Sequence, residues 1–462
     1  MDISHSAWPT FQLREVLEIN PRPPAGSLSG DSLASFIPMR CVEEESGRFE
    51  PLGDRKVGEV SKGYTPFRDG DVLFAKVTPC MENGKAAVMK GLTNGVGFGS
   101  TEFFALRPKD ELNAKYLLHF ILQGSFRRNA AGNMTGAVGL RRVPKSYMEQ
   151  QLIPLPSLPE QRRIVEEIEK QFTRLEAGVA ALRRVKANLK RYRAAVLKAA
   201  CEGRLVPTEA ELAKAENRKF ETGEELLARI LTERRQWITR QQADAETRKK
   251  YVEPAQPETK NLPAPPEGWT WGTWNQLSNW VTYGFTRPMP HVDAGIPIIT
   301  AKGVNKGHID FEGAHLTTKD AYVKLSEKDR PQPGDILITK DGTIGRAAVV
   351  DTDRDFCINQ SVAVIWLRSC PIERKFMLAV IESELTQKPI WAKARGVAIQ
   401  HLSITDFAKM PLPIPPLAEQ ARIVAEVERR LSVVEELESV VSANLQRATR
   451  LRQSILLKAF TG

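Results

Sequence analysis

The chain has few of the residues that build disulfide frameworks, metal clusters or membrane spans. Its 462 residues include only five cysteines and six histidines. The cysteines lie far apart without a C-x-x-C pair, which excludes a zinc knuckle or a disulfide scaffold. No apolar run reaches the roughly 18 residues that cross a bilayer. The opening MDISHSAWPT has neither a basic flank nor an apolar core, so we expect a protein of the reducing cytoplasm.

The sequence also lacks the motifs of common enzymes. No Walker loop, H-E-x-x-H, G-x-S-x-G or Rossmann G-x-G-x-x-G occurs. The glycine-rich GVGFG at 95–99 precedes an expected strand, whereas nucleotide loops follow one. NPRPP at 20–24 lacks the aromatic residue of the amino-methyltransferase signature, and no acid-x-Lys triplet follows a Pro-Asp on a strand. We therefore predict no catalytic site and no metal site.

What the chain does have is an excess of positive charge and enough length for several domains. Lys and Arg number 66 against 56 Asp and Glu, a formal net charge of +10. This balance fits a polyanionic partner but does not by itself establish one. Apolar residues make up 42% and charged residues 26%, as in folded globular chains. The length is about three times that of one typical domain.

An internal repeat covers almost the whole chain. LPSLPEQRRIV at 155–165 returns as IPPLAEQARIV at 414–424, a shift of 259 residues. GDVL at 70–73 matches GDIL at 334–337, and both copies open with a tryptophan, Trp8 or Trp269. Because a repeat decides the architecture, we expect each copy to hold a globular segment, a proline-rich stretch and then a long helix.

Each predicted helix carries a heptad repeat of apolar residues. The helices follow the proline clusters at 154–159 and 411–416 and end at glycines 203 and 462. Some 40 residues make a rod of about 60 Å, and the other repeat is the natural partner for its apolar stripe. The predicted seam residues are Ile168, Phe172, Leu175, Val179, Leu182, Leu189, Val196, Val427, Leu431, Val434, Val441, Leu445 and Ile455. In the first helix the register loosens onto Val185 and Tyr192, and in the second Leu437 and Leu451 lie beside the seam.

The globular segments carry short β-branched or aromatic runs, which indicate strands at 71–76, 103–106, 335–340 and 362–367. We expect helices at 113–123 and, as its counterpart, at 373–385. We predict an α+β fold in which two globular mixed α/β domains with twisted, mainly antiparallel sheets are joined by two long antiparallel coiled-coil helices in a pseudo-twofold tandem repeat. The predicted boundaries are 1–155 for the first domain, 156–203 for its helix, 204–267 for a charged, proline-rich connector with a docking helix from 224 to about 250, 268–415 for the second domain and 416–462 for the second helix.

The function that remains is binding. Two domains on a spacer suit separated half-sites on duplex DNA, where Arg, Lys and Asn reach base edges and Lys and Thr commonly bind phosphate. The loop after each repeated strand supplies such residues, and a second polar segment follows in each copy. The predicted DNA contacts are Lys76, Thr78, Met81, Asn83, Lys85, Arg141, Arg142, Lys145, Lys302, Lys306, Lys340, Thr343, Arg346, Gln400 and His401. For each of them, a solvated loop residue is the competing interpretation.

Several of these motifs together point to a known family. They are the repeated I/L-P-x-L-x-E-Q-x-R-I-V start of each long helix and the helix ends LKAACEG at 197–203 and LKAFTG at 457–462. In this combination the chain resembles the specificity (S) subunits of bacterial type I restriction–modification systems, over nearly its whole length. FAKVTPCMENGK at 74–85 with GSTE at 99–102, and GDILITKDGTIG at 334–345, look like two varieties of target recognition domain.

This resemblance implies a non-catalytic subunit. Each recognition domain would read one half of a split DNA target, and the paired helices would fix the unread gap. The implied partners are double-stranded DNA, two methyltransferase (M) subunits and two restriction (R) subunits, with no membrane, in the cytoplasm of a bacterium or archaeon. No cofactor is expected on this chain, because S-adenosylmethionine, ATP and Mg would belong to the partner subunits. The alternative is a stand-alone sequence-specific DNA-binding protein or regulator.

Overall fold

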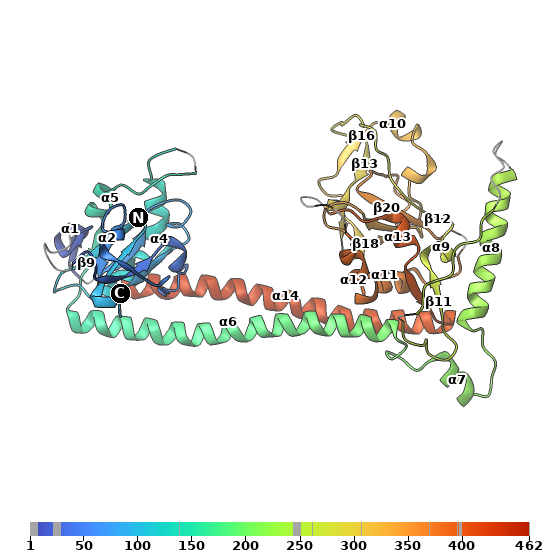
Figure 1. Ribbon diagram of the computed structural model, residues 1–462, viewed down its shortest axis with the longest axis horizontal. Coiled ribbons are helices and arrows are strands. Elements are labelled where there is room, and N and C mark those ends of the chain that lie inside the picture. Colours follow the sequence, from blue (N-terminus) through green and yellow to red (C-terminus); the bar gives the residue numbers. More distant parts are fainter. Residues whose placement is uncertain are drawn as a thin grey trace. The chain divides into compact units, whose positions relative to one another are not determined.

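The chain folds into two compact units. The computed structural model describes residues 8–21, 29–137, 139–243, 251–260, 262–305, 307–368, 370–394, 396 and 400–461. The first unit comprises residues 1–185 and 440–462, and the second comprises residues 186–439. Two long helices, α6 (Leu158–Cys201) and α14 (Leu417–Thr461), each contribute one part to each unit (Figure 1). Among the described helices, none has the length and apolar character of a membrane span.

The first unit is built on two four-stranded sheets. One has the order β2-β9-β6-β7 and is antiparallel, and the other has the order β4-β3-β8-β5 with β3 and β8 parallel. The strands β1 and β10 form a separate antiparallel pair. The strands are β1 (Thr10–Gln12), β2 (Leu17–Ile19), β3 (Leu33–Ile37), β4 (Asp54–Lys56), β5 (Thr65–Arg68), β6 (Val72–Ala75), β7 (Ala86–Val88), β8 (Val96–Gly99), β9 (Phe103–Pro108) and β10 (Leu152–Pro154).

The main helix of this domain packs its apolar side into the core. The helix α3 (Ala114–Ile121) is capped by Asn113, whose side chain accepts hydrogen bonds from two backbone N–H groups of the first turn, a common N-cap arrangement. Tyr116 and Phe120 of α3 pack with Phe460 of α14, at ring centroid distances of 4.8 and 5.6 Å. The short helices around α3 are α1 (Leu13–Val16), α2 (Val57–Val60), α3 (Ala114–Ile121), α4 (Gly124–Gly132) and α5 (Lys145–Gln150).

The second unit repeats this plan. Its four-stranded sheet has the order β12-β20-β17-β18, the counterpart of β2-β9-β6-β7, and β13 pairs in parallel with β19 as β3 does with β8. The strands are β11 (Thr270–Thr273), β12 (Trp280–Tyr283), β13 (Ile296–Ile299), β14 (Val304–Asn305), β15 (His308–Ile309), β16 (His315–Thr317), β17 (Ile336–Thr339), β18 (Ala347–Val349), β19 (Cys357–Ile358), β20 (Val362–Trp366) and β21 (Pro411–Ile414). The helices of its globular part are α9 (Trp274–Leu277), α10 (Lys319–Val323), α11 (Arg374–Glu382), α12 (Glu384–Ala392) and α13 (Ile404–Ala408).

The repeated Gly-Asp that precedes β6 and β17 has a structural role. Gly70 and Gly334 adopt φ values of 90° and 87°, which favour glycine. The carboxylate of Asp71 is buried and accepts two 2.8 Å hydrogen bonds from the Arg107 guanidinium. Asp335 is equally buried and accepts a backbone hydrogen bond from Gln332 N at 2.9 Å. The motif therefore fixes the turn into each central strand, and it is not a DNA contact.

The long helices pair in antiparallel fashion in both units. Glu176 of α6 meets Arg452 of α14 in the first unit, and Arg193 meets Glu435 in the second, so partner numbers fall along one helix as they rise along the other (Figure 1). The buried seam residues are Ile168, Phe172, Leu189, Val196, Val427, Leu431, Val434 and Val441. The half-buried ones are Leu175, Val179, Leu182, Leu445 and Ile455. These features confirm the predicted α+β repeat with two long helices.

Four residues assigned to the heptad pattern do not lie in the seam. Val185, Tyr192, Leu437 and Leu451 are 42–51% exposed. An ideal α-helix has 3.6 residues per turn and drifts relative to a seven-residue repeat, so an apolar pattern extended from sequence eventually leaves the contact face. Their exposure shows where the apolar positions leave the buried part of the helix pair.

The connector between the two copies contains two helices. The helix α8 (Gly223–Ala243) matches the expected docking helix, and residues 244–250 of that prediction lie outside the described residues. Leu226 and Ile230 of α8 are buried in the core of the second unit. The shorter helix α7 (Glu209–Ala215), with Thr208 as its N-cap, was not predicted. The connector is therefore part of the second unit and not a free linker.

Candidate nucleic-acid interface

In the first domain, the backbone brings together the two basic segments that the sequence keeps apart. The chain leaving β6 pairs with the segment that leads into α5. Thr78 N donates to Arg141 O at 3.0 Å, and Val143 N donates to Lys76 O at 2.9 Å. Two neighbouring stretches of backbone therefore carry Lys76, Thr78, Arg141 and Arg142. This arrangement allows the four residues to form one surface.

An acidic side chain orients the cations of this surface. The Arg142 guanidinium donates two hydrogen bonds to the Glu102 carboxylate, both 2.8 Å long, and these bonds hold the pKa of Glu102 below its usual value. The Lys76 ammonium lies 5.4 Å from the centre of the Phe104 ring, and burial lowers the pKa of Lys76. Two cations thus share one anion, which leaves net positive charge and a fixed guanidinium plane for phosphate or a base edge.

The structure overturns one predicted DNA contact, Met81. Met81 N donates to Val77 O at 3.0 Å in a tight turn after β6, and its side chain is fully buried in the core beside Phe74. A thioether with no exposed surface cannot reach DNA. The sequence prediction was wrong because the turn points this side chain inward, where its volume packs the core.

Two other residues of the 76–85 loop are half-buried. The Thr78 hydroxyl donates to Met134 Sδ at 3.4 Å. Lys85 Nζ donates to Met39 O at 3.4 Å. Both side chains keep part of their surface in solvent, so they are available to a phosphate only in part.

The remaining predicted contacts of the first domain are exposed. Asn83 is exposed, and its amide donates to Glu44 Oε1 at 2.9 Å. Arg141 is exposed beside Arg142, and Lys145 lies 3.5 Å from Glu149 one turn along α5. Weak exposed ion pairs of this kind exchange readily for another anion, so these side chains remain candidates for DNA contact.

The second domain repeats the backbone arrangement. Leu402 N donates to Lys340 O at 2.7 Å, the counterpart of the bond from Val143 to Lys76. Gly342 N donates to Gln400 O at 2.9 Å. The segment after β17 is thereby joined to the segment before α13, and the predicted residues of both segments lie together.

The side chains of this second surface again gather around one acid, here a lysine and a histidine. Lys340 Nζ donates to Asp341 Oδ1 at 2.7 Å, and its ammonium lies 5.3 Å from the centre of the Tyr283 ring. His401 Nδ1 lies 2.8 Å from the same Asp341 oxygen and is 54% exposed. A lysine over an aromatic ring, next to a carboxylate, therefore occurs in both domains.

The other predicted residues of the second domain lie around this surface. Lys302 and Thr343 are exposed. Arg346 is exposed and donates from Nη1 to Asn305 Oδ1 at 3.2 Å. The half-buried Gln400 donates to Gly396 O at 2.8 Å. Lys306 lies outside the described residues, and its predicted role stays a prediction.

Sequence reasoning missed the acids and rings of these surfaces. Donors to DNA can be recognised by residue type. Residue type does not indicate that Glu102 and Asp341 orient such donors, or that Phe104 and Tyr283 lie under the lysines. Only Asp341 could have been recognised from the sequence as a partner of a lysine, because it directly follows Lys340. The other three come from different strands or loops, and only the fold brings them close.

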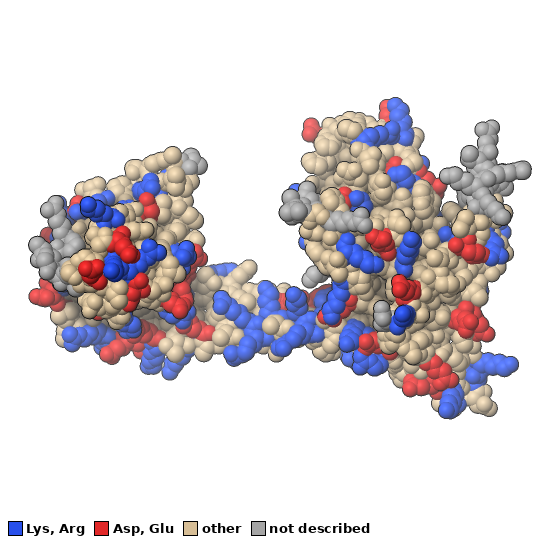
Figure 2. Space-filling model, viewed as in Figure 1, with Lys and Arg blue, Asp and Glu red and all other residues tan. Residues whose placement is uncertain are grey.

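The surface charge is mixed over the globular parts and more uniform on the long helices. On the face shown in Figure 2, Lys and Arg gather along the helices, whereas both signs alternate on the domains. The basic side chains Arg183, Arg184, Lys186, Lys190 and Arg191 of α6 are exposed.

The two domains share the strand order of one four-stranded sheet, and each has a lysine-led loop joined to a second polar segment. Both domains are attached to the paired long helices. These features define a class of DNA-recognition protein with two reading modules. The family model described as the type I restriction modification DNA specificity domain matches residues 5–181 and 291–438. The chain belongs to this family.

Known proteins support this assignment along the whole chain. The specificity subunits of the type I restriction enzymes EcoEI and EcoAI of Escherichia coli are each 26% identical to it, over 97% of this chain and 82% and 81% of their own lengths. The solved structure of the HsdS subunit from Thermoanaerobacter tengcongensis matches 98% of the chain with a TM-score of 0.53 at 19% identity. A chain from a structure of type I R-M complex assembly and conformational transition matches 99% with a TM-score of 0.68 at 21% identity. These two structures share the fold.

Proposed function

We propose that this chain is the DNA-recognition subunit of a type I restriction–modification complex and that each domain reads one half of a two-part target. The observation that carries the proposal is the duplicated surface, in which Lys76 with Arg141 and Arg142, and Lys340 with Gln400 and His401, are joined by equivalent backbone hydrogen bonds. Duplicated reading modules predict two half-sites separated by an unread gap.

We further propose that the chemistry belongs to partner subunits. Two methyltransferase subunits would methylate adenine with S-adenosylmethionine, and two restriction subunits would use ATP and Mg to translocate and cleave DNA. The complex would act on double-stranded DNA in the cytoplasm. The chain itself would hold no cofactor, and its role would be to place the target in front of the partner active sites.

A stripe on α14 is the proposed dock for a methyltransferase subunit. Val433 and Leu437 follow a helical spacing of four residues and are 51% and 44% exposed. An apolar stripe of this kind on a surface helix marks a protein interaction site. A helix of the partner, packed alongside α14, would remove it from water.

The test is base-modification sequencing of DNA from cells that express this chain with its neighbouring methyltransferase subunit. We expect methyladenine in a two-part motif with a fixed gap, which disappears when this chain is omitted. Cells with an empty vector provide the background. If an assembled complex, with a methyltransferase that is active beside another specificity subunit, gives no new motif, the chain is a stand-alone DNA-binding protein or has lost recognition.

A further inference from the structure

The loop of residues 43–48 lies between the 76–85 loop and the paired helices of the first unit. Its own hydrogen bonds keep it rigid. Ser46 Oγ and Arg48 Nε both donate to Glu43 Oε2 at 2.9 Å, and the bond from Arg48 lowers the pKa of Glu43. Glu45, at the tip, has a φ of 55°, a left-handed conformation that persists where neighbouring contacts enforce it.

One side of the 43–48 loop holds the 76–85 loop. Glu45 N donates to Gly84 O at 3.0 Å, and the amide of Asn83 donates to Glu44 Oε1 at 2.9 Å. Arg127 of α4 donates to Glu82 O at 2.5 Å and also pairs with the Glu45 carboxylate. The 43–48 loop, which carries Glu43, Glu44 and Glu45, therefore holds the proposed DNA-facing 76–85 loop in place.

Gly84 shows how close this contact is. It adopts a φ of 70°, and a Cβ at this position would lie 2.9 Å from Arg127 Nη1 and 3.2 Å from Glu45 Cγ. A side chain would have to displace one of them. The two loops are thus packed without free space, so a shift of the 43–48 loop moves the 76–85 loop with it.

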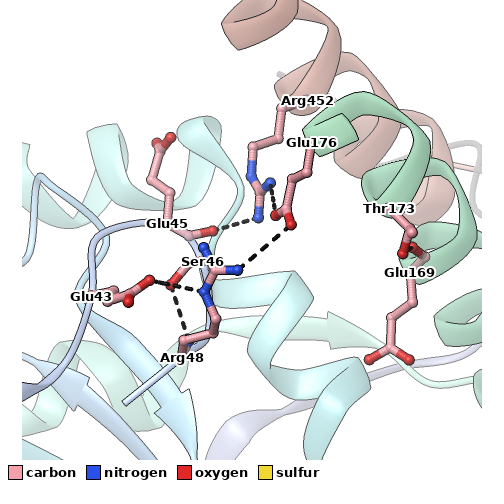
Figure 3. A network of polar contacts seen from close by, with 8 residues as sticks. All are labelled: Glu43, Glu45, Ser46, Arg48, Glu169, Thr173, Glu176 and Arg452. Atoms are coloured by element: carbon pink, nitrogen blue, oxygen red, sulfur yellow. Dashed lines mark hydrogen bonds and ion pairs between the residues drawn. The ribbon is translucent and has the colours of Figure 1, made fainter. Parts of the chain in front are cut away.

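The other side of the 43–48 loop is held by the long helices (Figure 3). Arg452 of α14 donates from Nη2 to Glu45 O at 2.6 Å, and its Nη1 lies 3.4 Å from Glu176 Oε1 of α6. Gln453 of α14 donates to Glu45 Oε1 at 3.3 Å and accepts from Gly124 N at 2.7 Å. A single arginine thereby joins the acidic loop to both helices.

The Arg452 side chain is enclosed at this junction. It is 15% exposed and its guanidinium lies 3.9 Å from the centre of the Phe172 ring. Burial lowers its pKa, which reflects the cost of removing a cation from water. That cost is offset where fixed acceptors surround the charge, and Glu45 O and Glu176 supply them. Removing the guanidinium would take this donor from Glu45 O and leave Glu176 with Arg48.

We propose that Arg452 and Glu45 are positioning residues for base recognition by the first domain. This inference rests on the proposed DNA-recognition function and extends it. Arg452 fixes the 43–48 loop on the helices, and Glu45 with Glu44 fixes Asn83 to Lys85 on that loop. Discrimination between bases depends on donor placement to a fraction of an ångström, so a residue far along the chain from the reading loop sets its specificity.

The second domain shows the same principle with different residues. The hairpin of β14 and β15 occupies the corresponding place, since Gly307 bridges Ala348 in parallel as Gly47 bridges Ala87. From this hairpin Asn305 accepts a hydrogen bond from Arg346, as Glu44 accepts one from Asn83. In both domains a residue of the preceding segment orients a proposed DNA contact.

The test is Arg452→Gln in the complex with the methyltransferase subunit, read by base-modification sequencing of host genomic DNA. The half-site of the first domain is identified by exchanging residues 1–155 for those of another specificity subunit. We expect methylation at sites with one mismatch in that half-site to rise at least fivefold relative to matched sites, while the other half-site keeps its preference. Arg447→Gln, an exposed arginine on the same helix, should leave both unchanged.

Two further variants separate positioning from folding. Glu176→Gln removes the ion pairs that Glu176 makes with Arg452 and with Arg48 of the loop. It leaves the bond from Arg452 to Glu45 O, so a smaller change in the same half-site is expected. Arg452→Lys keeps the charge with one donor group, and it carries the test if Arg452→Gln does not fold. A uniform loss of methylation with both base preferences intact, or equal relaxation of both halves, overturns the inference. Absence of any two-part motif with the unaltered chain instead refutes the proposed function.

Discussion

Single side chains at the first surface differ in whether they have an acidic partner. Arg142 is paired with Glu102, and Arg141 beside it is exposed. We expect Arg142→Ala to weaken binding of the complex to its target duplex at least tenfold, because it removes a donor and leaves the Glu102 carboxylate facing phosphate. Arg141→Ala should cost less, and adding Glu102→Gln to Arg142→Ala should restore part of the affinity in fluorescence anisotropy. Equal losses for the two alanine variants would contradict this charge arrangement.

Met81 lies in the neighbouring loop, but we expect its replacement to lower stability and not DNA recognition. Because its side chain fills the core, Met81→Ala should cost about 2–5 kcal/mol of stability through the cavity that it leaves. The methylated motif should stay the same at a permissive temperature. Met81→Leu, of similar volume, should restore the thermal midpoint. A changed motif in Met81→Leu, which keeps the core filled, would mean that this residue takes part in recognition after all.

His119 makes the first unit sensitive to acid. It is buried in α3 against Phe172, and within the described structure both ring nitrogens lack a hydrogen-bond partner. Burial lowers its pKa to about 4 from the usual 6.5. Between these values the unfolded chain binds a proton that the folded chain does not, so the free energy of unfolding decreases as the pH falls, by up to about 3 kcal/mol.

The measurement for His119 is the thermal midpoint from pH 7 to pH 4. The unaltered chain should lose stability over this range, and His119→Leu should lose less, because leucine does not titrate. Parallel curves for the two proteins would show that other groups cause the acid sensitivity.

At the scale of the element, α14 has one face in the seam and another that we propose for the methyltransferase subunit. Leu437→Lys places a charge in the exposed stripe, and we expect it to reduce co-purification of that subunit at least tenfold without changing the helix content. Val323→Lys, at an apolar residue of α10 that is 59% exposed, is the matched control. Unchanged co-purification of the Leu437 variant would place the dock elsewhere.

The sequence was most informative where neighbours along the chain decide the structure. The heptads predicted α6 and α14, and the β-branched runs predicted β6, β9, β17 and β20, because helix and strand periodicities are local. The contact between Glu45 and Arg452 could not be read in this way. It joins residues 407 apart in the chain, and no spacing rule connects a loop with a helix at that separation. The prediction for Met81 was wrong for a related reason, since only the fold decides which way a loop side chain points.

At the scale of the whole molecule, the duplication predicts modular recognition. Replacing residues 1–155 with the corresponding domain of another specificity subunit should change one half of the methylated motif and leave the other half intact. Base-modification sequencing of the co-expressed complex gives the motif, and the unaltered chain is the control. If both halves changed, the two domains would not read independently.

The division of the long helices between the units also sets an order of events during synthesis. The first domain is made early, but its core includes Leu456 and Phe460 of α14, which are translated after the whole second domain. Translation proceeds at roughly 5–20 residues per second, so Tyr116 and Phe120 stay without their α14 partners for tens of seconds. The second unit, residues 186–439, is complete before the first one can close. We therefore expect the N-terminal domain to be the part that most needs chaperones on the ribosome.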